Sequence, residues 1–100
     1  MTPTALRQTE AELQQAIIDL AIALGWLVYH THDSRHSASG FPDLTLVRGD
    51  RLLFAELKSE TGKLSLSQQV WFEALVASGN DVRVWRPSDW PGIERELRRR

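Results

Sequence analysis

The sequence predicts an α/β fold in which helices flank a mixed β-sheet. Apolar residues recur at helical spacing in some segments and cluster or alternate at strand spacing in others, with turn residues between them. The order along the chain is helix, three strands, helix, strand and a short C-terminal helix. A run of strands interrupted by a helix in this way is typical of a sheet covered by helices.

The first helix is expected to begin after Thr9, because Thr9 and Glu12 have the spacing of a capping box. Apolar residues within Leu13–Leu24 recur at helical spacing, and Gly25 is expected to end the helix. The segment Trp26–His30 is rich in aromatic and β-branched residues, so it is predicted as a short strand.

The centre of the chain is predicted as a β-hairpin. A polar loop over residues 32–40 leads to Pro42, which lacks a backbone donor and is best placed where a strand starts. The two strands are Leu44–Val47 and Arg51–Lys58, and the Gly49-Asp50 pair between them is typical of a tight turn.

The C-terminal half is predicted to add a helix, a strand and a short last helix. Ser65 and Gln68 resemble a second capping box, before a helix that runs through Ala77. Asp81–Arg86 is expected to be the last strand, and the final helix is expected to start at Ser88. The tryptophans expected in the core are Trp26, Trp71 and Trp85, while Trp90 is expected to dock the last helix or to build a dimer contact.

Length and composition indicate one globular domain over residues 1–100. The chain is 42% hydrophobic and 25% charged, and its net charge of −1 means that any nucleic-acid contact has to come from local patches. The absence of cysteine excludes disulfides and thiolate zinc sites. No apolar run approaches the ~20 residues that span a bilayer, and the N-terminus lacks a signal pattern, so an intracellular location without membrane contact is expected.

Two carboxylates and an ammonium group are predicted to meet at one end of the hairpin. Asp43 follows Pro42, and after twelve intervening residues comes a Glu-x-Lys motif, Glu56 with Lys58. Strand alternation places Glu56 and Lys58 on one face, and pairing of the hairpin brings Asp43 beside Glu56. Paired carboxylates suit Mg²⁺, so the motif outlines a metal-dependent site that cleaves phosphodiesters, although an exposed Glu-x-Lys on an edge strand is often only a solvated face.

Other polar residues have both a functional and a structural interpretation. Glu10 could supply a third acidic group, or it could simply interact with the helix N-terminus, which is worth only ~0.3–1 kcal/mol. Gln14, one turn on, could hold Glu10 or reach a metal-bound water. Gln68 could cap its helix after Ser65 or orient the attacking water, and both roles stay open.

The histidines His30, His32 and His36 do not complete a tetrahedral zinc set and are better interpreted as part of a solvated segment. Arg35 or His36 is expected to contact a phosphate. The basic end of the chain, Arg98–Arg100, is either a solvated tail or a patch that binds a nucleic-acid backbone.

Together these motifs resemble the virus-type replication-repair nuclease (VRR-NUC) domain, over about residues 9–87. The matching residues are Glu10 with Gln14, Gly40-Phe41-Pro42-Asp43, Glu56-Leu57-Lys58, Gly62, and Gln68 before Trp71. His30 stands where an arginine is expected in many relatives. The resemblance implies a restriction-endonuclease-like core of the PD-(D/E)xK superfamily.

The resemblance also implies a Mg²⁺- or Mn²⁺-dependent endodeoxyribonuclease. Asp43, Glu56 and the Leu57 carbonyl would hold the metal, with Glu10 bound directly or through water. Lys58 would position or deprotonate the attacking water, or stabilise charge on the phosphorane, and Gln68 would assist. The residues expected to contact DNA are Lys63, Arg35, His36 and Gln14.

Short members of this family are similar to dimeric Holliday-junction resolvases. A homodimer that acts on branched DNA is therefore expected, in the cytoplasm of a bacterial or phage-infected cell or wherever the DNA is. One alternative is a restriction-type, flap or duplex endonuclease of the same fold, although 100 residues leave little room for an element that reads bases. The other is a catalytically silent DNA-binding module.

Overall fold

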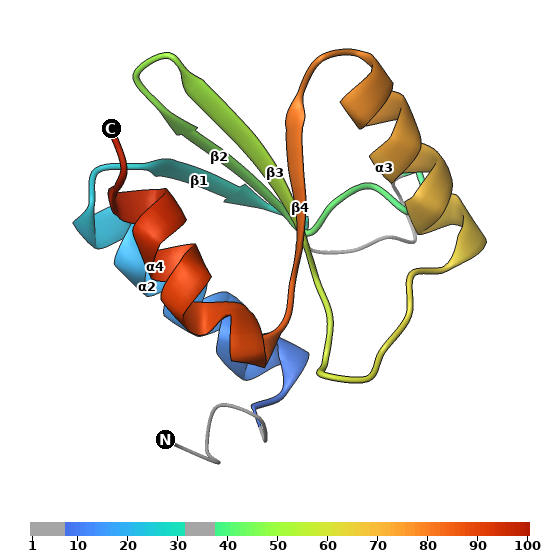
Figure 1. Ribbon diagram of the computed structural model, residues 1–100, viewed down its shortest axis with the longest axis horizontal. Helices are drawn as coiled ribbons and strands as arrows, with labels where there is room; N and C mark the ends of the chain where they lie inside the picture. Colours follow the sequence, from blue (N-terminus) through green and yellow to red (C-terminus); the bar gives the residue numbers. More distant parts are fainter. Residues whose placement is uncertain (1–7, 32–37) are drawn as a thin grey trace.

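The computed structural model describes residues 8–31 and 38–100, and within them a four-stranded mixed sheet forms the centre of the molecule (Figure 1). This confirms the predicted fold class, and the predicted boundaries agree with the structure to within about two residues. The elements in chain order are α2 (Glu10–Ala23), β1 (Leu27–His30), β2 (Leu44–Arg48), β3 (Arg51–Leu57), α3 (Leu66–Ala77), β4 (Asp81–Trp85), a 3₁₀ turn (Pro87–Asp89) and α4 (Trp90–Arg98).

The strand order β1-β2-β3-β4 follows the sequence. The first three strands are antiparallel neighbours, whereas β3 and β4 are parallel and are joined through α3, because a parallel pair needs a crossover connection. In the hairpin, Leu44 pairs with Ala55, which sets Asp43 opposite Glu56 where β2 begins and β3 nears its end. The register therefore brings together the two carboxylates that the sequence predicted to meet.

Helices α2 and α4 lie side by side over one face of the sheet (Figure 1). The capping box predicted for α2 is present, since the Thr9 side chain accepts from the Glu12 amide at 3.1 Å and the Thr9 amide donates to the Glu12 carboxylate at 2.9 Å. The core lies between these helices and the sheet. Its fully buried members include Leu13 and Ile17 of α2, Leu44, Leu46, Leu53, Ala55 and Leu57 of the sheet, and Ile93 and Leu97 of α4. Among the described residues, no helix is long and apolar enough to cross a bilayer.

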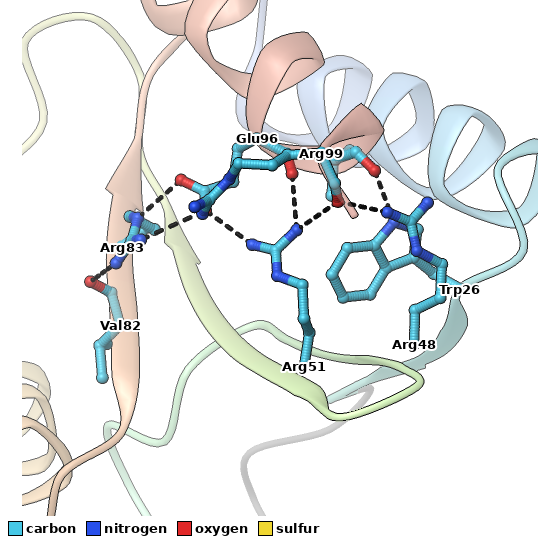
Figure 2. Close-up of polar contacts among 8 residues, drawn as sticks. Trp26, Arg48, Arg51, Val82, Arg83, Glu96 and Arg99 are labelled. Atoms are coloured by element: carbon cyan, nitrogen blue, oxygen red, sulfur yellow. Dashed lines mark hydrogen bonds and ion pairs between the residues drawn. The ribbon is translucent and has the colours of Figure 1, made fainter.

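The C-terminal end of α4 is held by side chains of the sheet and of the segment before β1. The buried Trp26 indole donates to the Leu97 carbonyl at 2.9 Å, and the guanidinium groups of Arg48 and Arg51 lie 4.8 and 5.0 Å from its ring centre (Figure 2). Arg51 also donates to the Glu96 carbonyl at 2.9 Å. These bonds satisfy carbonyls that a helix end leaves without intrahelical partners.

Glu96 of α4 lies at the centre of a cluster of arginines at this end of the sheet (Figure 2). Its carboxylate accepts from Arg51 at 2.8 Å, from Arg83 at 3.1 Å and from Arg99 at 2.8 Å. Burial by itself raises the pKa of Glu96, but the hydrogen bonds and charges of Arg83 and Arg99 outweigh it and leave that pKa below its usual value. This carboxylate is therefore saturated with cationic donors.

Helix α3 lies on the other side of the sheet, beside β4 (Figure 1). All of its residues are described, and each is exposed or half-buried. The prediction that Trp71 lies in the core is wrong, because α3 contacts β4 and the loop before β2 instead of crossing the centre of the sheet. The Trp71 ring meets Phe41 edge-on at 5.0 Å, and Phe41 meets Phe54 at 5.9 Å. Trp26 and Trp85 are buried as predicted, and Trp90 packs partly buried against the core.

Candidate active site

Asp43 is held at the start of β2 by the turn before it and by backbone bonds to neighbouring strands. Its Oδ2 accepts from the Leu57 amide at 2.8 Å, and its carbonyl accepts from the Thr31 amide at 3.0 Å. Gly40 adopts φ +92°, and a methyl group there would overlap with the backbone of Ser67 at the start of α3. Only glycine fits this close approach, which brings the turn that carries Asp43 against α3.

Glu56 is the only charged residue among the buried residues of the described chain, with 4% of its surface exposed. It lies on β3, on the sheet face that α3 partly covers. Its Oε2 accepts from Gln68 Nε2 at 2.8 Å and lies 3.9 Å from Lys58 Nζ. Its Oε1 is buried and has no hydrogen-bond partner among the described residues. A buried carboxylate oxygen without a partner is costly unless something else binds it.

Burial raises the pKa of Glu56 to about 8, and the charge of the neighbouring Asp43 contributes to this increase. The nearby Lys58 ammonium acts in the opposite direction and does not cancel it. Near neutral pH, Glu56 therefore keeps a proton, which a divalent cation would displace. An adjacent pair of carboxylates that cannot both ionise freely is a common sign of a functional site.

This donor set fits a hard divalent cation. Mg²⁺ binds through one or two carboxylates while keeping several waters, and the orphan Oε1 of Glu56 beside Asp43 offers that arrangement. No group of three His, Asp or Glu side chains comes together among the described residues. Glu10, exposed at the start of α2, is therefore not brought into the pair as the sequence proposed. Its position in the first turn of α2 suits the favourable interaction of a carboxylate with a helix N-terminus.

Lys58 directly follows β3 and is held there by the next strand. Its amide donates to the Trp85 carbonyl at 3.0 Å, and only 13% of its side chain is exposed. A mostly buried lysine beside a buried carboxyl group has few alternative positions for its ammonium. The structure thus places Lys58 where the sequence predicted it, next to Glu56 and on the same side of the strand.

Gln68 has both of the contacts that the sequence left open. Its Oε1 accepts from the Ser65 amide at 2.8 Å and its backbone amide donates to Ser65 Oγ at 3.2 Å, which completes a capping box. The other end of the same amide group, Nε2, donates to Glu56. One side chain therefore joins the N-terminus of α3 to the candidate site and fixes how Glu56 is oriented.

A polar cleft of about 290 Å³ opens beside Asp43 and Gln68. Hydroxyl groups line much of it, namely those of Thr31, Ser39, Ser65 and Ser67, and of these the sequence pointed only to Ser65, as a helix cap. Ser67 Oγ lies 3.1 Å from Ser39 Oγ and 3.2 Å from Ser65 Oγ. Hydroxyls are ordinary ligands of phosphate oxygens. Serine and threonine are too common in turns and caps for their positions alone to have predicted this cleft.

Of the remaining residues proposed from the sequence, the structure describes Lys63 and Gln14. Lys63 is exposed in the loop before α3, and Gln14 is half-buried on α2. Arg35 and His36 lie outside the described residues, as does His32.

Comparison with known proteins adds to this geometry. A family described as the VRR-NUC domain matches residues 3–89. The "Fanconi-associated nuclease 1 homolog" of Schizosaccharomyces pombe is 36% identical over 75 residues, which cover 73% of this chain but only 10% of that protein. This chain therefore spans about a tenth of the length of that relative.

Two solved structures have the same fold. One, titled "VRR_NUC domain", superposes with a TM-score of 0.66 at 28% identity and covers 75% of this chain and 81% of its own. The other, titled "VRR_NUC domain protein", has a TM-score of 0.63 at 20% identity, with 79% and 78% covered, and at that identity it shows the fold alone. With the family matched over residues 3–89, this chain belongs to the VRR-NUC domain family.

Proposed function

We propose that this chain is a divalent-metal-dependent, structure-selective endodeoxyribonuclease that acts as a homodimer on branched DNA of the Holliday-junction type. Membership of the VRR-NUC family supports a nuclease. The observation that carries the metal-dependent chemistry is the pair formed by half-buried Asp43 and buried Glu56, in which Glu56 has a raised pKa and an oxygen without a partner.

Asp43, Glu56 and the Leu57 carbonyl would hold Mg²⁺ or Mn²⁺. When bound, such a cation supplies Lewis-acid activation of the phosphodiester and lowers the pKa of water. Asp43 is fixed for this task because its other role, accepting from the Leu57 amide, ties it to β3. Glu10 would take part only through water, since it stands outside the pair in the structure.

Lys58 would position or deprotonate the attacking water, or stabilise charge on the phosphorane. The Lys58 ammonium group lies 3.9 Å from the Glu56 carboxylate. The proposed metal ligands and this ammonium group are therefore close together. Gln68 would keep Glu56 oriented through their 2.8 Å hydrogen bond. Lys63, exposed beyond Lys58, would contact the DNA backbone, together with Gln14, Arg35 and His36.

Exposed apolar side chains on β1 and on α3 support a homodimer. Large apolar side chains are exposed on β1 and on α3, among them Leu27 at 74%, Tyr29 at 64%, Leu66 at 80% and Val70 at 67%. Exposed apolar side chains of this size favour association with another surface. A dimer with two-fold symmetry would present two sites to opposing strands of a junction.

The test is cleavage of labelled four-way junction, flap and linear duplex DNA by the purified protein in Mg²⁺ or Mn²⁺. Lys58→Ala should lower the cleavage rate by about 10²–10⁴-fold, the usual contribution of a positioned acid–base group. The matched control is Lys63→Ala, which should weaken binding while leaving the rate on saturating DNA close to that of the unmodified protein.

Paired nicks on the junction alone, lost in Lys58→Ala, would establish a resolvase, and sedimentation of the same sample should give a dimer. Cleavage of flaps or duplex instead would support nuclease activity and contradict the proposed resolvase activity. DNA binding without metal-dependent product on any substrate would contradict the proposal and favour a silent binding module.

A further inference from the structure

Arg86 reaches from the end of β4 to the loop that directly follows Lys58. Its Nη1 donates to the Ser59 carbonyl at 2.7 Å and to the Gly62 carbonyl at 2.6 Å, with a longer contact of 3.4 Å to the Glu60 carbonyl. A guanidinium group presents its donors in a fixed planar arrangement, so it is well suited to hold several carbonyls of one turn together.

The same loop is attached a second time, through Glu60. Its carboxylate accepts from the Ser88 amide at 3.1 Å and from the Ser88 hydroxyl. The loop over residues 59–62 is therefore fastened to the segment after β4 both by its backbone and by a side chain. Exposed connecting loops usually lack such anchors and are more mobile than the elements they join.

The anchored loop packs against the side chain of Lys58. A methyl group placed on Gly62 would lie 3.6 Å from Lys58 Cδ and 3.0 Å from Ser59 Oγ, so the backbone of Gly62 already lies beside the aliphatic part of the lysine. The Gly62 amide donates to Ser59 Oγ at 3.0 Å, which closes the turn. The lysine is confined on this side by a turn whose carbonyls Arg86 holds.

We infer that Arg86 is a positioning residue for Lys58. It acts by holding the turn at residues 59–62 against the lysine stem, which limits the rotamers that the long side chain can adopt and keeps its ammonium beside Glu56. The backbone of Lys58 is fixed independently, because its amide donates a hydrogen bond to the Trp85 carbonyl. This inference rests on the proposed function, because it assigns to Arg86 an effect on the step that Lys58 performs.

The test compares Arg86→Ala with Arg83→Ala under single-turnover conditions. Both arginines come from the same part of the chain, but Arg83 donates to Glu96, away from the loop. Arg86→Ala should lower the cleavage rate constant on saturating DNA by about 10- to 100-fold, since small misplacements of a reacting group have effects of this size. Arg83→Ala should not change the rate constant. DNA affinity, measured without divalent cation, should be the same in both variants.

Two further variants separate positioning from a general effect on stability. Arg86→Lys keeps the positive charge and several donors, so it should recover part of the lost rate. In the Lys58→Ala background, Arg86→Ala should lower the residual rate no further, because residues that act through one another do not contribute additively. Fully additive losses, or a loss in DNA affinity alone, would overturn the inference and indicate that Arg86 contacts DNA.

Hydrogen exchange tests the structural step without any activity. The Gly62 amide should exchange faster in Arg86→Ala and at the original rate in Arg83→Ala, with both proteins still folded by thermal melting. If Arg86→Ala does not fold, Gly62→Ala replaces it, because the added methyl group crowds Ser59 Oγ, shifts the turn that packs against Lys58 and should lower the rate constant while Arg86 is intact.

Failure of the proposed function and failure of the proposed role of Arg86 give different results. An unmodified protein that does not cleave DNA contradicts the proposed function. An unmodified protein that cleaves, with Arg86→Ala or Gly62→Ala equally fast, overturns only the role of Arg86.

Discussion

Glu56 and Glu96 are two carboxylates largely withdrawn from solvent whose surroundings are opposite. The side chain of Glu96 is 15% exposed and accepts from Arg51, Arg83 and Arg99, so its pKa lies below the usual value. The side chain of Glu56 is 6% exposed and faces Asp43, which contributes with burial to a pKa of about 8. One carboxylate is surrounded by donors, and the other has an acidic neighbour and a free oxygen.

The difference separates a carboxylate with an architectural role, Glu96, from the one that we propose binds metal, Glu56. Removing a charge from water is unfavourable unless hydrogen bonds and opposite charges compensate it, and at Glu96 this compensation is complete. At Glu56 the compensation is incomplete in the protein alone, because Gln68 and Lys58 approach only one carboxylate oxygen, and a bound divalent cation would complete it. An acidic neighbour beside a buried glutamate is therefore a clearer sign of a functional site than burial alone.

The largest expected difference between Glu56 and Glu96 is in the effect of their substitution on the rate of DNA cleavage. Glu56→Gln keeps the shape of the side chain but cannot lose a proton to become a negatively charged metal ligand, so metal-dependent cleavage should fall by about 10²-fold or more, as when one electrostatic contact to a transition state is lost. Glu96→Gln should leave the cleavage rate unchanged. Equal losses in both variants, measured on the same DNA under saturating metal, would break the comparison.

Substitutions at the same two positions should affect the free energy of unfolding in the opposite order, with the larger loss at Glu96. Glu96→Ala leaves Arg51, Arg83 and Arg99 close together without their acceptor and should lower the free energy of unfolding by about 3 kcal/mol. Glu56→Gln removes a repulsive neighbour from Asp43, so the metal-free protein at pH 8 should be at least as stable as before. Urea denaturation of the metal-free proteins measures both, and a strongly destabilised Glu56→Gln would show that this carboxylate is mainly structural.

A smaller effect is expected in the pH dependence of stability. The folded-state pKa of Glu56, about 8, lies above the ordinary value of 4.5, so between these values the folded protein holds a proton that the unfolded chain releases. The stability associated with this proton is fully present below pH 4.5 and is lost as the pH rises through about 8. Glu96 has a lowered pKa, so its contribution is present above pH 4.5 and is lost in acid.

Denaturation of the metal-free protein at a series of pH values should show the loss of stability toward pH 8, and Glu56→Gln should abolish it. Added Mg²⁺ or Mn²⁺ competes with the same proton, so it should stabilise the protein more at pH 8 than at pH 6. A pH profile that stays unchanged in Glu56→Gln would assign the titration to another group.

Local patterns explain why so much of this arrangement could be predicted. The capping boxes at Thr9 and Ser65 involve residues three positions apart, and strand alternation with a tight turn was sufficient to bring Asp43 opposite Glu56. The proximity of Lys58 followed from the same alternation. Each of these depends only on the geometry of one helix end or one hairpin.

Contacts between distant segments could not be predicted in the same way. Nothing near Arg86 in the sequence indicates that it meets a turn some 25 residues earlier, and nothing near Glu96 indicates the arginines of β3 and β4. Trp71 was assigned to the core from its apolar neighbours, but where α3 sits depends on packing against other elements. Periodicity shows which residues share a helix face and does not show how closely that face approaches the sheet.

Gly40 gives a way to distinguish ancestry from activity in this fold. Its role is steric, because the start of α3 occupies the space that a side chain would need. Selection on the backbone should therefore keep the glycine even in descendants that no longer cut DNA, while Asp43, Glu56 and Lys58 become free to drift. In such a lineage, a retained glycine would indicate that the fold is inherited, and the presence or loss of the charged residues would indicate whether the proposed activity is retained.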